Sequence, residues 1–555
     1  MNKNKLVLIL IIILAFVLRF YKLNSYPALN ADEAAIGYNA YSLIQTGRDE
    51  HGNPWPIHFQ SFNDYKPGLY FYMVVPFVKV LGLNEWAVRI PGAMLGVLTV
   101  LLMYLLVKEL FREGFTQIHK QMNADVLASI ASLILEISPW HIHFSRGGWE
   151  VNVATFFMVL GLWLFLKGKG SLPLLMLSAL SFVLSLYTYH AARVVVPLLL
   201  FGLLVIYRYE IRKNIKQIAI TGTIAFLLLI PLGLDLIKGD VASRAAGVGL
   251  LSDPGPLARI NEQRGEHENI RGLPALFLHN RPVNYGLAFL ENWSDHYSGG
   301  FLFISGDVIQ RNAVPETGQM YLFDILFIIL GLIYFFRTYS LHTKPYYLIL
   351  WWLLIAPTAA ALTFQSPHAL RSQNMVIPLT IITAFGFAYS LNRLSTVKLK
   401  WLGVTGFLVF GLLGIWSFSR YLNMYWYHMS KEYPYSSQYG IKELVTFVKE
   451  NQDRYDNIVV TDRYDQPYIL FLFYFKYPPA RFQKEHNLTP RDAYEFSTVR
   501  SFDKYHFLSI NWDRDRLTYP KSLIIGTDEE IPNEANIVQE IYGTNGYKYF
   551  QAVAN

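Results

Sequence analysis

Long apolar runs, separated by short polar segments, repeat along most of the chain. A helical run of about 20 apolar residues can cross the hydrocarbon core of a membrane, which is about 30 Å thick. We therefore expect a polytopic α-helical membrane protein with about eleven transmembrane helices. The apolar runs lie near residues 6–23, 87–108, 125–142, 149–167, 172–189, 193–208, 216–237, 320–337, 345–363, 374–392 and 401–420.

The pattern changes after residue 420. The stretch GIKELVTFVKENQDRYDNIVVTD has a helical period of apolar residues and then a β-branched run, which predicts an amphipathic helix followed by a strand. The stretches KYHFLSINW and KSLIIGTDEE are typical of further strands. We expect residues 1–420 to form a transmembrane domain and residues 421–555 to form a small α/β domain.

The Lys and Arg residues in the short loops predict the topology, because cytoplasmic loops of membrane proteins carry an excess of basic residues. With a cytoplasmic N-terminus, the cytoplasmic segments hold sixteen basic residues, whereas three short outer loops hold one each: Arg146, Arg193 and Arg371. The C-terminus is then extracytoplasmic. Two long loops are also outside, residues 24–86 with interfacial helices on the membrane, and residues 238–319.

The composition agrees with this class and excludes others. Hydrophobic residues make up 53% of the chain and charged residues only 16%, compared with about 25% charged residues in an average soluble domain. The net charge of +7 comes from topology-setting loops, so we expect no nucleic-acid partner. The absence of cysteine excludes disulfides and a cysteine-ligated metal.

Acidic and basic side chains recur on the predicted outer face. Each has an ordinary explanation, because loop carboxylates are commonly solvated and an Arg at a helix end commonly reaches lipid headgroups. Together they suit a reaction of an acceptor hydroxyl with a lipid-borne phosphate, in which a carboxylate accepts the proton and cations neutralise the phosphate. The candidates are Asp32, Glu33, Lys66, Arg146, Glu150, Arg193, His368 and Arg371.

Metal binding has weak support in the sequence. His141 and His143 form an HIH pattern without further ligand spacing. The first outer loop holds no clear Asp-x-Asp or Glu-x-Asp pair. We therefore predict no metal site and no cofactor, although the sequence leaves a divalent metal open.

Four segments, taken in order, resemble the GT-C superfamily of polytopic glycosyltransferases. The resemblance is to the branch of protein O-mannosyltransferases and lipid A aminoarabinose transferases, and it covers about residues 1–420. The matching segments are NADEAAIGYNA, YKPGLYFY, SPWHIHFSRGGWEVNVATFF and SPHALRSQNMVIPL.

The resemblance implies an enzyme that moves a sugar from a polyprenyl-phosphate donor to an acceptor hydroxyl outside the cytoplasm, with inversion at the anomeric carbon. In the family pattern Asp32 would be the base or positioning group, with Glu33 as its supporting neighbour. Glu150 stands where the family carries a second acid. The donor phosphate would be contacted by Lys66, Arg371 and His368, and we add Arg146 and Arg193 to this set.

The tail departs from part of this branch. The carbohydrate-binding repeats of eukaryotic protein mannosyltransferases are not evident in it, and it is similar to the small α/β cap of prokaryotic members. We therefore expect a prokaryotic plasma-membrane protein. The acceptor stays open between a lipid, a glycan and a protein.

Two other classes are alternatives to the transferase, namely a transporter and a polymerase of lipid-linked glycans. A transporter would show repeat symmetry and ionisable residues near the middle of the membrane. A polymerase similar to O-antigen ligases would carry its catalytic residues in a large late loop. The charges here gather at one face and begin in the first loop, which favours the transferase.

Overall fold

A computed structural model describes residues 3–62, 64–112, 123–237, 249–338, 344–395, 400–490 and 497–555. The chain forms two compact units, each built from separate stretches of sequence. Unit 1 comprises Met1–Arg19, Met94–Ser145 and Glu150–Leu422. Unit 2 comprises Phe20–Ala93, Arg146–Trp149 and Asn423–Asn555.

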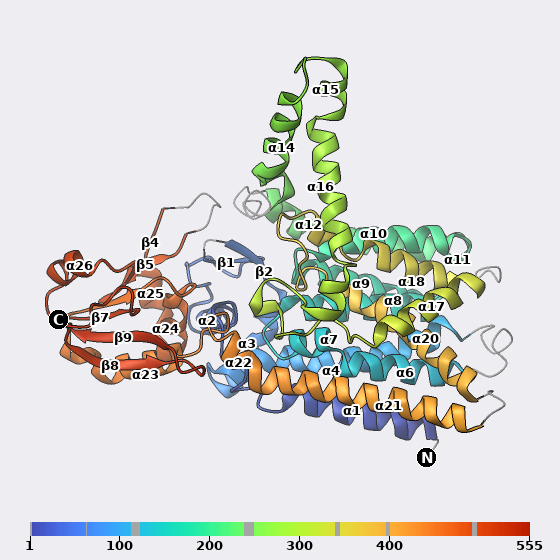
Figure 1. The fold of residues 1–555 in the computed structure, drawn as a ribbon, viewed down its shortest axis with the longest axis horizontal. Coiled ribbons are helices and arrows are strands. Elements are labelled where there is room, and N and C mark those ends of the chain that lie inside the picture. The colour runs from blue at the N-terminus through green and yellow to red at the C-terminus, as the bar shows by residue number, and fades with distance from the viewer. Residues whose placement is uncertain are drawn as a thin grey trace. The chain divides into compact units, whose positions relative to one another are not determined.

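Unit 1 is built from apolar helices, several of which run alongside one another in Figure 1. Its main helices are α1 (Lys3–Phe20), the greater part of α4 (Glu85–Leu110), α6 (Ala124–Ile137), α7 (Pro139–Ser145), α8 (Glu150–Lys167), α9 (Leu172–Thr188), α10 (Ala192–Ile206), α11 (Arg208–Lys213), α12 (Ile215–Ile237), α17 (Asp324–Thr338), α18 (Lys344–Ile355), α19 (Thr358–Ala361), α20 (Val376–Ser395) and α21 (Lys400–Asn423).

A helix lies at each of the eleven predicted runs. In the described part of the chain, five helices are long and apolar enough to cross a membrane, or six if α6 and α7, bent by 60°, form one span. Others are shorter, such as α9 and α10. These helices are those of an integral membrane protein, whereas the number of eleven spans stays a prediction.

Glycines allow two helices of unit 1 to pack closely. A Cβ on Gly386 of α20 would lie 1.8 Å from the carbonyl oxygen of Phe327 in α17. A Cβ on Gly331 of α17 would lie 2.2 Å from the carbonyl oxygen of Ile382 in α20. Small residues let helix backbones approach one another in this way. The tight contact of α17 with α20 therefore depends on these two positions.

A helical hairpin stands out from unit 1 in Figure 1, across the direction in which α10 and α21 run. We call it the arm. It consists of η2 (Leu250–Ser252), α14 (Pro254–Gly265), α15 (Leu273–Leu278) and α16 (Arg281–Asp295). It occupies most of the predicted second outer loop, of which residues 238–248 lie outside the described residues. The short segments η3 (Gly300–Ile304) and η4 (Gln310–Asn312) follow the arm.

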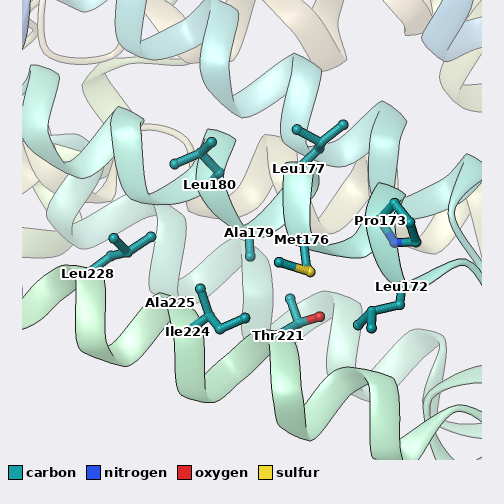
Figure 2. A pocket seen from close by; sticks show the side chains of 10 residues that line it. All are labelled: Leu172, Pro173, Met176, Leu177, Ala179, Leu180, Thr221, Ile224, Ala225 and Leu228. Carbon is teal, nitrogen blue, oxygen red and sulfur yellow. The ribbon is translucent and has the colours of Figure 1, made fainter.

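An apolar groove of about 460 Å³ lies between α9 and α12. Figure 2 shows the side chains of the two helices facing each other across it. Thr221 is the one polar residue among the ten that line the groove in the described structure. The groove suits an apolar chain and offers little to bind a sugar or a phosphate.

Unit 2 combines the first loop with the tail. The first loop forms α2 (Ala31–Thr46), an antiparallel hairpin of β1 (His58–Ser61) and β2 (Asp64–Pro67), and α3 (Leu69–Leu81). The helix α3 agrees with the predicted apolar helix of this loop, and its position on the membrane stays a prediction. The helix α2 packs against α24 (Pro467–Phe475) and α25 (Pro479–Glu485) of the tail.

The tail forms a seven-stranded mixed sheet in the order β4-β5-β6-β3-β7-β9-β8. The predicted amphipathic helix is α23 (Ile441–Asn451), and the three predicted strands are β3 (Asn457–Thr461), β6 (Tyr505–Leu508) and β7 (Ser522–Gly526). β3 is parallel to both β6 and β7. The remaining elements are η7 (Met424–His428), α22 (Met429–Glu432), η8 (Gln452–Arg454), β4 (Asn487–Leu488), β5 (Val499–Phe502), α26 (Trp512–Thr518), β8 (Ile537–Tyr542) and β9 (Lys548–Ala554).

Candidate functional site

The predicted acidic pair lies in the first turn of α2. Asn30 caps this helix: its side chain accepts a hydrogen bond from the Glu33 N–H at 3.0 Å, and its own N–H donates to Glu33 Oε2 at 3.3 Å. This reciprocal pair is a capping box. It fixes the start of α2, the turn that carries Asp32.

Asp32 forms an ion pair with Lys66 of β2. The Asp32 side chain is 25% exposed and that of Lys66 is 8% exposed. The Lys66 ammonium also lies 4.6 Å from the centre of the Phe62 ring. The positive end of α2 and the ammonium both stabilise negative charge on Asp32. Within unit 2 the structure thus brings together the predicted base and one predicted phosphate-binding residue.

Glu33 has a different environment, because its carboxylate is buried and bound on several sides. Arg89 of α4 donates to both oxygens, each at 2.6 Å, and the Gly148 N–H donates to Oε1 at 2.9 Å. Arg89 is itself fully buried and also donates to three carbonyl oxygens of the chain that leads to α2: Leu23, Pro27 and Ala28. This fork-to-fork pair holds α2 and α4 together.

Sequence reasoning missed Arg89. Its position inside an apolar helical run could have identified it as a structural or functional residue, because arginines are rare in such runs and need a partner. The structural role of Glu33 could also have been predicted, because Asn30 and Glu33 have the spacing of a capping box. Both features indicate that Glu33 holds the structure of unit 2 around Asp32.

Arg146 lies in an aromatic setting in unit 2. Its guanidinium lies 4.6 Å from the centre of the Trp426 ring, and its Nε donates to the Tyr425 hydroxyl at 3.1 Å. Its Nη2 donates to the carbonyl oxygens of Tyr21 and Tyr26 at 2.7 and 3.3 Å. The residue is fully buried. These contacts fit a residue that joins the first loop to the start of the tail.

Two other predicted cations line one cavity of unit 1. The cavity has a volume of about 770 Å³, and both Arg193 and Arg371 contribute to its wall, together with His190. Arg193 Nη1 is 3.0 Å from His190 Nδ1, and Arg371 Nη1 donates to the Thr363 hydroxyl at 2.7 Å.

The other lining residues make this cavity mostly apolar, and no carboxylate is among the described residues that line it. The rest of the wall is Tyr189, Ala191, Val194, Leu236, Gly249, Leu250, Leu251, Tyr285, Gly286, Phe289, Ala359, Leu362 and Thr363. A guanidinium offers a planar fork that matches phosphate oxygens. Apolar walls with a few convergent polar groups are typical of small-molecule sites. The cavity therefore suits an amphiphile with an anionic group.

The turn that carries Arg371 is held by two residues that sequence reasoning also missed. Asp307 accepts hydrogen bonds from the Ala369 N–H at 2.7 Å and the Ile309 N–H at 2.8 Å. The His368 N–H donates to His296 Nε2 at 3.1 Å. Asp307 and Ala369 are 62 residues apart, and His296 and His368 are 72 residues apart, so no local pattern could have paired them.

The protonation of His296 follows from its surroundings. Burial lowers the pKa of His296 to about 4, so its ring is neutral at pH 7. Its Nδ1–H donates to the Asn292 carbonyl at 2.7 Å, which leaves Nε2 as the acceptor for the His368 N–H. Burial also raises the pKa of Asp307. The imidazole of His368 lies 3.8 Å from Asp307, so the described structure turns it toward this carboxylate.

The remaining candidates lie in unit 1. Glu150 is the first residue of α8 and is half-buried. His141 Nδ1 is 2.6 Å from Arg19 Nη2, and His143 Nε2 is 3.0 Å from the Arg311 carbonyl oxygen. The HIH pattern thus has other partners. Among the described residues, no three His, Asp or Glu side chains are arranged to hold a metal ion.

Sequence comparison relates the N-terminal part of the chain to a known family. Residues 9–237 match the family described as dolichyl-phosphate-mannose-protein mannosyltransferase. A curated Bacillus subtilis protein described as "Putative mannosyltransferase YkcB" is 27% identical over 188 residues, which are 33% of this chain. The match spans only 24% of that protein's length.

Structural comparison extends the likeness to nearly the whole chain. ArnT from Cupriavidus metallidurans, in a crystal structure with bound undecaprenyl phosphate, matches with a TM-score of 0.54 over 98% of this chain and 97% of its own, at 10% identity. The oligosaccharyltransferase AglB from Archaeoglobus fulgidus, in complex with an inhibitory peptide and a dolichol-phosphate, matches with a TM-score of 0.51 over 85% of this chain and 64% of its own, at 13% identity.

These findings confirm the resemblance to the GT-C superfamily. The structural matches establish the fold, and the sequence match covers the stretch that contains α2, Lys66 and α8. The chain thus has the fold of the GT-C glycosyltransferases, and its residues 9–237 are related to the dolichyl-phosphate-mannose-protein mannosyltransferases.

Proposed function

We propose that this chain is a glycosyltransferase that moves a sugar from a polyprenyl-phosphate donor to an acceptor hydroxyl. The observation that carries the proposal is the unit 1 cavity, in which Arg193 and Arg371 face a mostly apolar wall. A polyprenyl phosphate has the same division, because its phosphate is anionic and its chain is apolar. The guanidinium groups would bind the phosphate, and the apolar wall would bind the first part of the chain.

The comparisons support the donor class. The matching family is described by its dolichyl-phosphate-mannose donor, and the ArnT and AglB structures hold undecaprenyl phosphate and dolichol-phosphate. All three are polyprenyl phosphates or their sugar esters. The family match also makes mannose, or a sugar similar to it, the first donor to test.

Asp32 is the base in the proposed reaction. Its carboxylate is partly exposed and would accept the proton of the acceptor hydroxyl as the oxygen attacks the anomeric carbon. The bond from that carbon to the phosphate oxygen breaks, and the polyprenyl phosphate leaves with the electron pair. A single displacement of this kind inverts the anomeric centre.

The remaining predicted residues support these steps. An ammonium has three N–H donors, so Lys66 can hold Asp32 and still donate to a phosphate oxygen. Glu33 would position Asp32 through the capping box and its pair with Arg89. We keep Glu150 as the second acid. His368 and Arg146 would act by holding neighbouring elements, and they are weaker candidates for phosphate contact because of their present partners.

The proposed placement follows the loop charges. The N-terminus would be cytoplasmic, and α2 and the 421–555 domain would lie outside the cytoplasm of a prokaryotic plasma membrane. The acceptor would be a lipid, a glycan or a protein that reaches this side. A transporter and a polymerase similar to O-antigen ligases are both less favoured, because the family match points to a sugar transferase.

The cavity assignment is tested by donor binding. Purified full-length protein in lipid nanodiscs would be titrated with undecaprenyl phosphate, with Arg193→Ala and Arg371→Ala as variants and Arg208→Ala, an exposed arginine of α11, as the matched control. A hydrogen bond to a charged group contributes about 1.5–3 kcal/mol, so each cavity variant should weaken binding by about tenfold or more. Equal binding of undecaprenyl phosphate by the parent protein and by a variant that carries both Arg193→Ala and Arg371→Ala would overturn the assignment.

A further inference from the structure

The tip of the arm exposes large apolar side chains. In and beside α15, Leu273 is 82% exposed and Phe277 is 78% exposed. Ile270 and Leu278 are also more than half exposed. Soluble surfaces rarely gather so many exposed large apolar residues in one place, and such patches mark a binding surface.

The exposed surface continues along α16. Val283, Leu287 and Leu290 are 39%, 59% and 56% exposed. Their spacing of four and three residues places them on one face of the helix. The arm therefore exposes large apolar side chains both at its tip and on one face of α16, a face that a helix would normally bury.

The arm is held firmly although its tip projects. Near its base, Asn292 donates to the Thr363 carbonyl at 2.9 Å, Trp293 donates to the Leu354 carbonyl at 2.9 Å, and Tyr297 donates to the Leu353 carbonyl at 2.7 Å. Nearer the tip, Arg264 of α14 donates to the His279 carbonyl at 2.6 Å. The exposed residues are thus presented by an ordered hairpin, so their exposure is a property of the fold.

The tip of the arm carries basic residues beside its apolar ones. The tip, residues 269–283, carries Arg271 and Arg281, both exposed, and no Asp or Glu. The acidic residues of the arm lie outside this stretch: Glu266 and Glu268 directly precede it, and Asp253, Glu262, Glu291 and Asp295 lie farther from it along the chain. Basic residues beside exposed apolar ones are typical of segments that bind the interface of an anionic membrane.

The direction of the arm and its neighbours fit the same partner. In Figure 1 the arm stands across the direction of the apolar helices of unit 1, so it runs along the plane of a membrane that those helices cross. It follows α12, whose apolar span is only 11% buried within the protein and so faces lipid. Leu251, at the start of the arm, is 79% exposed.

We propose that the arm docks on the membrane that surrounds unit 1, with the residues of its tip among the acyl chains and Arg271 and Arg281 at anionic headgroups. The partner is the phospholipid bilayer itself. The proposal goes beyond the transferase function and does not depend on it. Tyr285 and Phe289 of α16 also line the unit 1 cavity, so a docked arm would hold that wall of the cavity at the lipid interface.

Lipid contact at the tip can be measured directly, because the chain has no cysteine. Leu273→Cys keeps Phe277 and accepts a polarity-sensitive fluorophore at the tip. Glu262→Cys, on the exposed face of α14, is the matched control. Both proteins would be reconstituted in vesicles of phosphatidylethanolamine and phosphatidylglycerol, with and without brominated phosphatidylcholine.

The tip fluorophore should be blue-shifted and lose at least half of its emission to the brominated lipid, while the control fluorophore should change little. Arg271→Gln with Arg281→Gln should reduce the quenching more in anionic than in zwitterionic vesicles. Equal, water-like emission at the two positions would overturn the proposal. A blue-shifted tip fluorophore that brominated lipid does not quench, and whose emission changes with the density of protein in the vesicles, would also overturn it. That result would identify a second copy of the chain as the partner. The vesicles contain no polyprenyl phosphate, so failure here would leave the proposed transferase function untouched.

Discussion

Replacing Arg89 with methionine should destabilise unit 2 strongly. The change removes the guanidinium and leaves the Glu33 carboxylate, which is 1% exposed, without its countercharge. Two backbone N–H groups would still donate to Glu33, from Asn30 and Gly148. Three carbonyl oxygens would lose their donor as well. Removing one partner of a buried ion pair costs about 3–5 kcal/mol, and we expect a loss in this range for Arg89→Met.

A double-mutant cycle separates the ion pair from general packing. Glu33→Gln keeps the shape of the side chain and removes its charge, so the double variant no longer buries an unpaired ion. Its loss of stability should be smaller than the sum of the two single losses, with an interaction free energy of about 2–3 kcal/mol. The free energy of unfolding of the purified protein would be measured in mixed micelles with increasing SDS.

Lys108→Met provides the matched control. Lys108 pairs with Asp125 at 2.7 Å, but its side chain is 46% exposed, and pairs exposed to this degree contribute about 0–1 kcal/mol. The control should therefore lie close to the parent protein. If Arg89→Met were as stable as Lys108→Met, or if the Glu33 and Arg89 losses simply added, the account of this buried pair would be refuted.

Three further results are expected. The folded-state pKa of His296, about 4, lies below its ordinary value of 6.5. The free energy of unfolding should therefore fall by about 3 kcal/mol as the pH drops from 6.5 to 4. His296→Gln should lack this pH-dependent loss when the two proteins are compared by thermal melting across this pH range. Gly386→Leu should force α20 away from Phe327 and cost about 1–3 kcal/mol in the same SDS unfolding assay. A cysteine replacing the exposed Gln45 should react with an impermeant maleimide on sealed cells, whereas one replacing Arg208 should react only after permeabilisation; the reverse result would invert the topology.

Local patterns in the sequence predicted much of the fold. Apolar runs located helices at eleven segments, and the change in period after residue 420 located the helix and strands of the tail. The number of membrane spans could not be predicted from the apolar runs in the same way, because α6 and α7 are bent at Ser138 and several other helices are short. Period and length describe where a helix forms but not where its direction breaks.

Long-range pairing explains what sequence reasoning missed. Glu33 and Arg89 are 56 residues apart, and His296 and His368 are 72 residues apart. No local period encodes such partners. The β1–β2 hairpin, which presents Lys66 to Asp32, was missed for a similar reason: its short strands lie in a stretch that we interpreted as loop and interfacial helix.

The central claim, that Asp32 is the base of a polyprenyl-phosphate-dependent transfer, is tested most directly by a single-turnover assay. Purified parent protein and Asp32→Asn, both reconstituted in lipid, would be given undecaprenyl-phosphate mannose and a membrane extract as the source of acceptor. A positioned base contributes about 10²–10⁴-fold to rate, so Asp32→Asn should transfer sugar at least 100-fold more slowly while binding the donor as the parent does. Transfer at the parent rate by a folded Asp32→Asn protein would contradict the account.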